Sequence, residues 1–156
     1  IKELKPKIIV ECGVLYGLST RVLLLGAKEV GAHVFSCDIA PPKKGLLDFI
    51  QKYDFYKYWT FYNENDLYAS RYYNKNIDLC ILDSNHETPH VLAQLSIYPQ
   101  DVTDNGSIFV HDSKHFWVKD AIDIWHSKHP EWVRKDYDTK LGYCEFRRNN
   151  NGKRTN

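Results

Sequence analysis

Three carboxylates stand directly after mostly apolar runs of the sequence, at positions where they could reach a common site. Asp38, Asp83 and Asp112 each follow a short run of the kind that is typical of a strand buried in a parallel sheet. Ligands bind beyond the carboxyl ends of such strands. We expect Asp83 and Asp112 to end neighbouring strands, so their oxygens could hold a hard cation such as Mg²⁺, which would favour the ionised form of a bound hydroxyl. The alternative is that both residues cap adjacent loops without a metal.

Two histidines lie beside these carboxylates in the sequence. His86 comes three residues after Asp83, and a side chain that titrates near neutral pH is suited to take a proton from a hydroxyl. Its other interpretation is a loop histidine that bonds a backbone carbonyl. His111 precedes Asp112 and could be a third metal ligand, or could point into the sheet by strand alternation. We expect four further histidines on the surface or in packing: His90, His115, His126 and His129.

The turn after the first expected strand reads E-C-G-V-L-Y-G-L-S over residues 11–19. Gly13 allows the backbone to leave the strand and approach a ligand closely, and Gly17 permits tight packing at the start of a helix. Only two glycines occur, four residues apart, so the pattern is not the dinucleotide motif G-x-G-x-x-G. A purely structural turn would explain it as well.

Polar residues at the next two strand ends fit a nucleoside. Asp38 can accept hydrogen bonds from both hydroxyls of a ribose, and Asn65 and Asp66 can meet an adenine amino group or ring edge. Each residue alone is better explained as a solvated loop position. Their occurrence at consecutive strand ends is harder to explain in that way.

Strand and helix patterns alternate along the chain, which predicts a Rossmann-like, doubly wound α/β fold with a mostly parallel sheet. Ser19 and Thr20 are candidates to cap the first helix, and Asp104-Asn105-Gly106 is typical of a turn. We expect one domain over residues 1–148 and a disordered tail over 149–156, since the tail has no apolar residue. The expected strands are 7–12, 33–37, 58–62, 77–82 and 107–111, followed by an antiparallel hairpin of 132–137 and 142–147. The expected helices are 17–28, 43–53, 90–98 and 116–129.

Composition favours a small-molecule partner. Lys plus Arg number 21 against 20 for Asp plus Glu, so no net charge would attract nucleic acid or an anionic membrane. The many aromatic residues lack the basic stripe that stacking on single-stranded nucleic acid requires. Four scattered cysteines without C-x-x-C spacing predict reduced thiols and a cytoplasmic location. No apolar run could span a membrane, and no export signal is visible. A homo-oligomer is not excluded. Because the sequence opens at Ile1 and contains no Met, we expect further residues upstream.

The pattern E-x-G-x-x-x-G-x-S, followed by an acid that ends the second strand, resembles the S-adenosylmethionine site of class I methyltransferases, especially the catechol type. The resemblance implies that the glycine turn lies against the methionine part of the cofactor and that Asp38 holds the ribose, where catechol enzymes usually carry Glu. It implies cofactor contacts from Glu11, Gly13, Leu15, Gly17, Ser19, Asp38, Ile39, Asn65, Asp66, Asp83 and Ser84.

A second resemblance lies in L-D-S-N-H-E (residues 82–87) and F-V-H-D-S (residues 109–113). Small bacterial methyltransferases, including relatives of the cephalosporin-tailoring enzymes, show a similar Asp-x-x-His loop and acidic pair. The resemblance spans residues 7–113 and implies methylation of a small-molecule hydroxyl, with Asp83 and His86 as catalytic residues and Mg²⁺ at Asp83, Asp112 and His111. Ser113 stands where catechol enzymes have a ligating Asn, and His86 where they place a Lys base. The alternatives are a nucleotide-dependent oxidoreductase and a non-catalytic S-adenosylmethionine-binding module.

Overall fold

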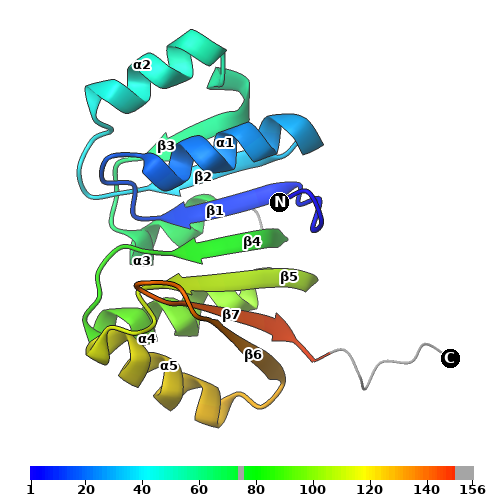
Figure 1. Ribbon diagram of the computed structural model, residues 1–156, viewed down its shortest axis with the longest axis vertical. Coiled ribbons are helices and arrows are strands. Elements are labelled where there is room, and N and C mark those ends of the chain that lie inside the picture. The colour runs from blue at the N-terminus through cyan, green and yellow to red at the C-terminus, as the bar shows by residue number, and fades with distance from the viewer. Residues whose placement is uncertain (74–75, 150–156) are drawn as a thin grey trace, which may run out of the picture.

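Strands of one mixed sheet and helices on both of its faces make up the computed structural model of the protein, which describes residues 1–73 and 76–149 (Figure 1). The strands are β1 (Ile8–Cys12), β2 (His33–Cys37), β3 (Trp59–Tyr62), β4 (Ile77–Leu82), β5 (Val102–His111), β6 (Trp132–Tyr137) and β7 (Tyr143–Arg148). The α-helices are α1 (Leu18–Val30), α2 (Lys44–Tyr53), α3 (Asp66–Ala69), α4 (Thr88–Ile97) and α5 (Phe116–Lys128). Short 3₁₀ helices are η1 (Tyr56–Tyr58), η2 (Ser70–Tyr72) and η3 (Tyr98–Gln100).

The strand order is β3-β2-β1-β4-β5-β7-β6, and the first five strands are parallel to one another. β7 inserts antiparallel between β5 and β6. The order reverses between β1 and β4, which is the switch point where open α/β sheets bind ligands. The predicted fold class, including the C-terminal hairpin, is confirmed.

The register of the parallel strands places the predicted polar residues at the same edge of the sheet. Cys12, the last residue of β1, pairs with Cys37 on one side and with Leu82 on the other. Leu82 in turn pairs with Val110 of β5. The residues that follow these four positions therefore meet at one edge of the sheet, toward which the arrowheads of β1, β4 and β5 point in Figure 1.

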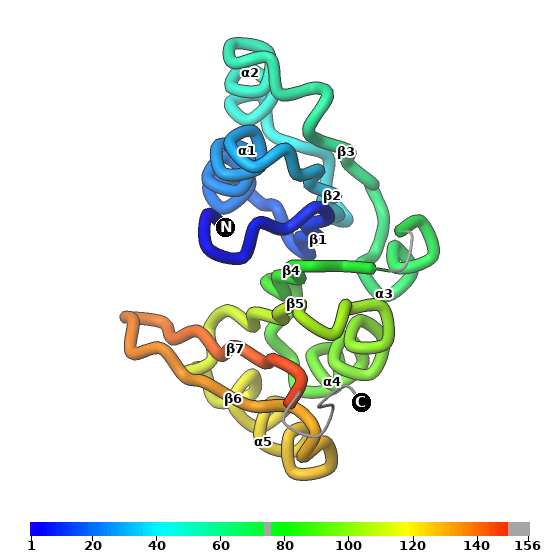
Figure 2. The backbone as a smooth tube through the Cα atoms, turned by 90° about the vertical axis from the view of Figure 1, so that its right-hand side faces the viewer, coloured from blue at the N-terminus to red at the C-terminus, as the bar shows by residue number. Residues whose placement is uncertain are grey.

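Two apolar cores hold the layers together. α1 and α2 pack on one face of the sheet around Leu24, Leu46 and Val34, and α3, α4 and α5 cover the other face around Leu95, Ile122 and Ile108 (Figures 1 and 2). β1 is buried by both layers, which explains why its sequence shows no alternation of apolar and polar residues.

One expectation about local structure needs correction, and another falls mostly on residues that the structure does not describe. The turn predicted at Asp104-Asn105-Gly106 is wrong, because β5 runs through these residues with a register irregularity opposite Ile77–Leu79. A Cβ at Gly106 would lie 2.8 Å from the carbonyl oxygen of Ile77, so glycine serves a close backbone approach there instead of a turn. Of the predicted tail, residues 150–156 lie outside the described residues.

Among the residues that the structure describes, no helix has the length and apolar character to cross a membrane.

Candidate active site

The turn between β1 and α1 has three residues with positive φ: Gly13 at 94°, Leu15 at 49° and Gly17 at 71°. At Gly13 an added Cβ would lie 2.0 Å from the carbonyl oxygen of Asp83, so the turn rests directly on the end of β4. Leu15 is strained, because an L-residue with a side chain rarely adopts this conformation. Strain of this kind is typical of ligand-binding turns.

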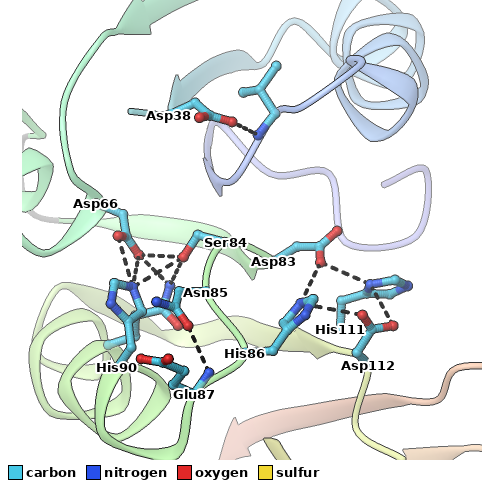
Figure 3. Close-up of polar contacts among 12 residues, drawn as sticks. Asp38, Asp66, Asp83, Ser84, Asn85, His86, Glu87, His90, His111 and Asp112 are labelled. Atoms are coloured by element: carbon cyan, nitrogen blue, oxygen red, sulfur yellow. Dashed lines mark hydrogen bonds and ion pairs between the residues drawn. The ribbon is translucent and has the colours of Figure 1, made fainter. Parts of the chain in front are cut away.

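Asp38 holds this turn in place (Figure 3). Its Oδ2 accepts hydrogen bonds from the backbone N–H of Val14 (2.8 Å) and of Leu15 (3.0 Å), and its Oδ1 accepts one from Ala40 (2.9 Å). Burial alone would raise the pKa of Asp38, but these hydrogen bonds and the nearby charge of Lys43 together lower it. The carboxylate expected to bind ribose is therefore ionised and also organises the turn.

Glu11 lies beneath the turn and is fully buried. It accepts hydrogen bonds from the hydroxyls of Ser19 (2.6 Å), Thr20 (2.8 Å) and Ser36 (2.7 Å). Burial raises the pKa of Glu11 in spite of these hydrogen bonds, and the charge of Asp83 adds to the effect. The prediction that Ser19 and Thr20 cap α1 is wrong: Gly17 occupies the cap position without a side-chain bond, and both hydroxyls turn toward Glu11.

A cavity of about 1020 Å³ opens at this edge of the sheet, large enough for a cofactor and an acceptor together. Two of the predicted cofactor residues, Glu11 and Gly17, are not among its lining residues, so their contribution is to shape the turn. The predicted cofactor residues that line it are Gly13, Leu15, Ser19, Asp38, Ile39, Asn65, Asp66, Asp83 and Ser84.

The second half of the cavity carries the predicted acid and histidine residues (Figure 3). Asp83, His86 and Asp112 each offer one ligand atom, and these atoms lie within 4.8 Å of one another. Nε2 of His86 is 3.4 Å from Oδ1 of Asp83 and 3.4 Å from Oδ2 of Asp112. Nδ1 of His111 lies 2.9 Å from Oδ1 of Asp83 and 3.2 Å from Oδ1 of Asp112. His111 thus faces the site, whereas the three residues whose ligand atoms lie close enough to hold one metal ion are Asp83, His86 and Asp112.

The carboxylates of Asp83 and Asp112 raise the pKa of two neighbouring side chains. The hydrogen bond with Asp83 raises the pKa of His86 against the opposing effect of burial, and the charges of Asp112 and Asp83 raise it further. Burial and the same two charges raise the pKa of Tyr143, whose ring lies 4.5 Å from that of His111. The site therefore has a negative potential that favours a cation.

A separate polar network, which the sequence analysis missed, lines the part of the cavity that was expected to meet adenine. Asp66 is buried, and Oδ2 accepts a hydrogen bond from the hydroxyl of Ser84 (2.9 Å) while Nε2 of His90 lies 3.0 Å from Oδ1. The side-chain amide of Gln94 donates to the same carboxylate. The expectation that His90 is a surface or packing residue is wrong, because it lines the cavity. Its four-residue spacing from Gln94 on one face of α4 is the signal that could have indicated a shared partner.

The cavity lining also includes residues that the sequence analysis did not predict, among them Ile81 of β4, Phe109 of β5 and Tyr143 of β7. Phe109 precedes His111 by two residues and therefore faces the same side of the sheet. Strand alternation could have identified it, but the position of Tyr143 depends on the antiparallel insertion of β7.

A family model described as a methyltransferase domain matches residues 10–113, which is most of the chain. The chain belongs to this family of methyltransferase domains. The match includes the glycine turn, Asp38 and both segments that carry the acid and histidine residues. No protein with a curated function matches this methyltransferase domain in sequence.

Solved methyltransferase structures share the fold of the domain at low sequence identity. The Podospora anserina methyltransferase PaMTH1, with S-adenosylhomocysteine bound, is 16% identical with a TM-score of 0.74, covering 95% of this chain and 74% of that one. A Staphylococcus aureus protein assigned as a caffeoyl-CoA O-methyltransferase is 16% identical with a TM-score of 0.73, covering 96% and 79%. A Clostridium thermocellum protein assigned as an rRNA methylase is 12% identical with a TM-score of 0.70, covering 92% and 89%.

Proposed function

We propose that this domain transfers the methyl group of S-adenosylmethionine to a hydroxyl oxygen of a small molecule, with assistance from a divalent cation. The observation that carries the proposal is that the glycine turn with Asp38 and the Asp83, His86 and Asp112 group line one cavity. A methyl donor held at the turn and a methyl acceptor held at the acidic group, which consists of Asp83, His86 and Asp112, would meet inside this cavity.

The geometry of the turn and the family both support S-adenosylmethionine as the methyl donor. Gly13 lets the backbone approach a ligand, and the ionised carboxylate of Asp38 can accept from ribose hydroxyls while it bonds the turn. Asn65 lines the cavity at the end of β3, although its Oδ1 already caps α3 through the N–H of Leu67. A relative of the same fold binds S-adenosylhomocysteine. The two-glycine turn argues against a nicotinamide dinucleotide.

The acidic group fits a divalent cation in one specific respect. Oδ1 of Asp112 is buried and has no hydrogen bond among the described residues. His111 lies near it, but the Nδ1 proton of His111 serves the shorter contact with Asp83. An unpaired buried carboxylate oxygen is costly, and a hard cation is a suitable partner for it. Asp83 and Asp112 would hold the cation, with His86 or His111 as a nitrogen ligand, and the cation would stabilise the ionised hydroxyl of the acceptor.

His86 is placed to accept the proton that the hydroxyl loses. Its Nε2 lies between the two carboxylates, which would stabilise the imidazolium that forms. The same nitrogen cannot ligate a cation and take a proton, so the two roles exclude each other. His111 orients Asp83 through its 2.9 Å contact.

Most of the rate enhancement would come from positioning. Methyl transfer is an in-line displacement that needs little acid-base chemistry beyond the removal of one proton, so holding donor and acceptor at attack distance is the main requirement. Ile81, Phe109 and Tyr143 give the acceptor side an apolar wall, which reduces competition from water.

Product formation tests the proposal directly. The domain is incubated with S-adenosylmethionine, Mg²⁺ and a set of hydroxylated small molecules, and S-adenosylhomocysteine is measured by mass spectrometry with and without EDTA. We expect product with at least one hydroxylated compound and its loss with EDTA. Product with RNA alone would move the acceptor to nucleic acid, and cofactor binding without any product would indicate a non-catalytic module.

A further inference from the structure

The buried carboxylate of Asp66 is the centre of a polar network that joins three separate segments (Figure 3). Asp66 begins α3 and is 5% exposed. Its oxygens accept from the hydroxyl of Ser84, in the loop after β4, and from Gln94 of α4, and both oxygens lie within 3.2 Å of Nε2 of His90. The phenol of Tyr98 also donates to the backbone carbonyl of Asp66 at 2.7 Å.

Each donor around the Asp66 carboxylate uses a proton in a hydrogen bond to it. A carboxylate only accepts hydrogen bonds, so Nε2 of His90 carries a proton. The hydroxyl of Ser84 donates its proton to Asp66 and accepts a hydrogen bond from the amide of Gln94 at 3.0 Å. Its proton is therefore used in the bond to Asp66. Loss of one donor would leave a buried carboxylate short of a hydrogen bond, and the other members would have to rearrange.

The network connects the two halves of the cavity. Asp66, Ser84 and His90 line the part that was expected to meet adenine, while Ser84 is directly bonded in sequence to Asp83 of the acidic group. His86 lies in the same loop, between Ser84 and the start of α4. A ligand that fixes Asp66 would therefore restrain the loop that presents Asp83 and His86.

We propose that His90 is a positioning residue which, through Asp66 and Ser84, makes the loop of residues 83–87 respond to cofactor occupancy. The proposal rests on the proposed binding of S-adenosylmethionine at this cavity, and it does not require a metal. Two sites are coupled when ordering of one lowers the free energy of ordering the other. Cofactor binding should then order the acceptor loop before an acceptor arrives.

Amide hydrogen exchange measures this coupling. In the wild type, S-adenosylhomocysteine should slow exchange both in the turn of residues 13–17 and in the loop of residues 83–87, each by roughly tenfold or more, within the range of measured couplings between sites. In His90→Leu the turn should keep its protection, while the loop should lose most of it. His90→Gln retains an N–H donor of similar reach and should restore much of the loop protection.

Controls separate the proposal from general destabilisation. Ser96→Ala removes a hydroxyl on the same helix whose partner, among the residues that the structure describes, is the carbonyl of Leu92. This variant should leave both regions as in the wild type. If His90→Leu does not fold, Ser84→Ala tests the same connection and should lose loop protection. Equal loop protection in the wild type and in the folded variants would overturn the role of His90. Absence of protection at the turn in the wild type would overturn cofactor binding itself, and the proposal with it.

Discussion

Gly13 and Asp83 are in backbone contact across the switch point of the sheet: a Cβ at Gly13 would lie 2.0 Å from the carbonyl oxygen of Asp83 and 2.9 Å from Cα of Ser84. The turn expected to bind the donor therefore rests on the first residue of the loop expected to bind the acceptor. The two halves of the site cannot be displaced independently, and this contact defines the distance between them.

Gly13→Ala should destabilise the domain strongly. Its φ of 94° and the overlap with β4 backbone together should lower the free energy of unfolding by about 3 kcal/mol or more. Gly31→Ala is a matched control, since Gly31 has a φ of 74° but nothing within 4 Å of an added Cβ, and it should cost only about 1 kcal/mol. Urea denaturation of both variants makes the comparison; equal losses would show that the close approach at Gly13 is unimportant.

Replacement of Asp38 should affect both stability and cofactor affinity. Asp38→Ala removes the acceptor of three backbone hydrogen bonds, so unfolding should become easier by about 1–3 kcal/mol. Affinity for S-adenosylhomocysteine should fall by about 1.5–3 kcal/mol, the range for charge-assisted hydrogen bonds. Calorimetry that gives equal affinity for the variant and the wild type would remove Asp38 from the cofactor site.

The free energy of unfolding should depend on pH through the ionisation of Asp38. Its pKa is lowered in the folded state, so its stabilising contribution is present above the unfolded value of about 3.9 and is lost as pH falls through the lower folded value. The stability difference between the wild type and Asp38→Asn should therefore be constant from pH 5 to pH 7 and shrink below about pH 4. A difference that stays constant into strong acid would mean that the carboxylate charge is not what holds the turn.

Much of the architecture could be predicted from the sequence because the signals are local. The runs that became β2, β4 and β6 have the predicted bounds. For β2 and β4 the reason is that short apolar or β-branched segments between polar loops define strands in the interior of the sheet. The strand ends then identified Asp38, Asp83 and Asp112. Parallel strands of matched register bring these carboxylates to one edge whatever the details of the loops.

The parts that could not be predicted depend on tertiary contacts. Ser19 and Thr20 looked like helix caps, but both hydroxyls donate to the buried carboxyl group of Glu11 instead of the helix end. The Asp-Asn-Gly segment looked like a turn, but it lies inside β5, at the register irregularity between the pairs Ile77–Val102 and Leu79–Ser107. The spacing of His90 from Gln94 could indicate a shared partner but could not identify it, because Asp66 lies 24 residues away from His90 in the sequence.

His86 should control the pH dependence of turnover if it is the base. His86→Ala should lower turnover by about 10²- to 10⁴-fold and leave cofactor affinity nearly unchanged. Because Asp83 and Asp112 raise the pKa of His86, the wild-type rate should rise as pH passes a value above the ordinary histidine value of about 6.5. A rate that does not change from about pH 6 to pH 9 would assign His86 to the cation as a ligand instead.

The two aspartates of the acidic group should differ in their effects. Asp112→Asn should abolish cation dependence and most activity while it spares cofactor binding, because Asp112 lies away from the glycine turn. Asp83→Asn should impair both, since the backbone of Asp83 contacts Gly13 and its side chain contacts His86 and His111. Rates at saturating cofactor, with calorimetry of S-adenosylhomocysteine, distinguish the two patterns; identical behaviour of both variants would argue against a cation between them.

The most direct measurement is the NMR signal of S-adenosylmethionine labelled with ¹³C at its methyl group and bound to the domain. If donor and cation share the cavity, stoichiometric Mn²⁺ should broaden the bound methyl resonance strongly, whereas Mg²⁺ should leave its width unchanged. In Asp112→Asn the resonance of the bound methyl group should persist and should no longer respond to Mn²⁺ at the same concentration. A bound resonance that Mn²⁺ leaves sharp in the wild type would contradict the shared site.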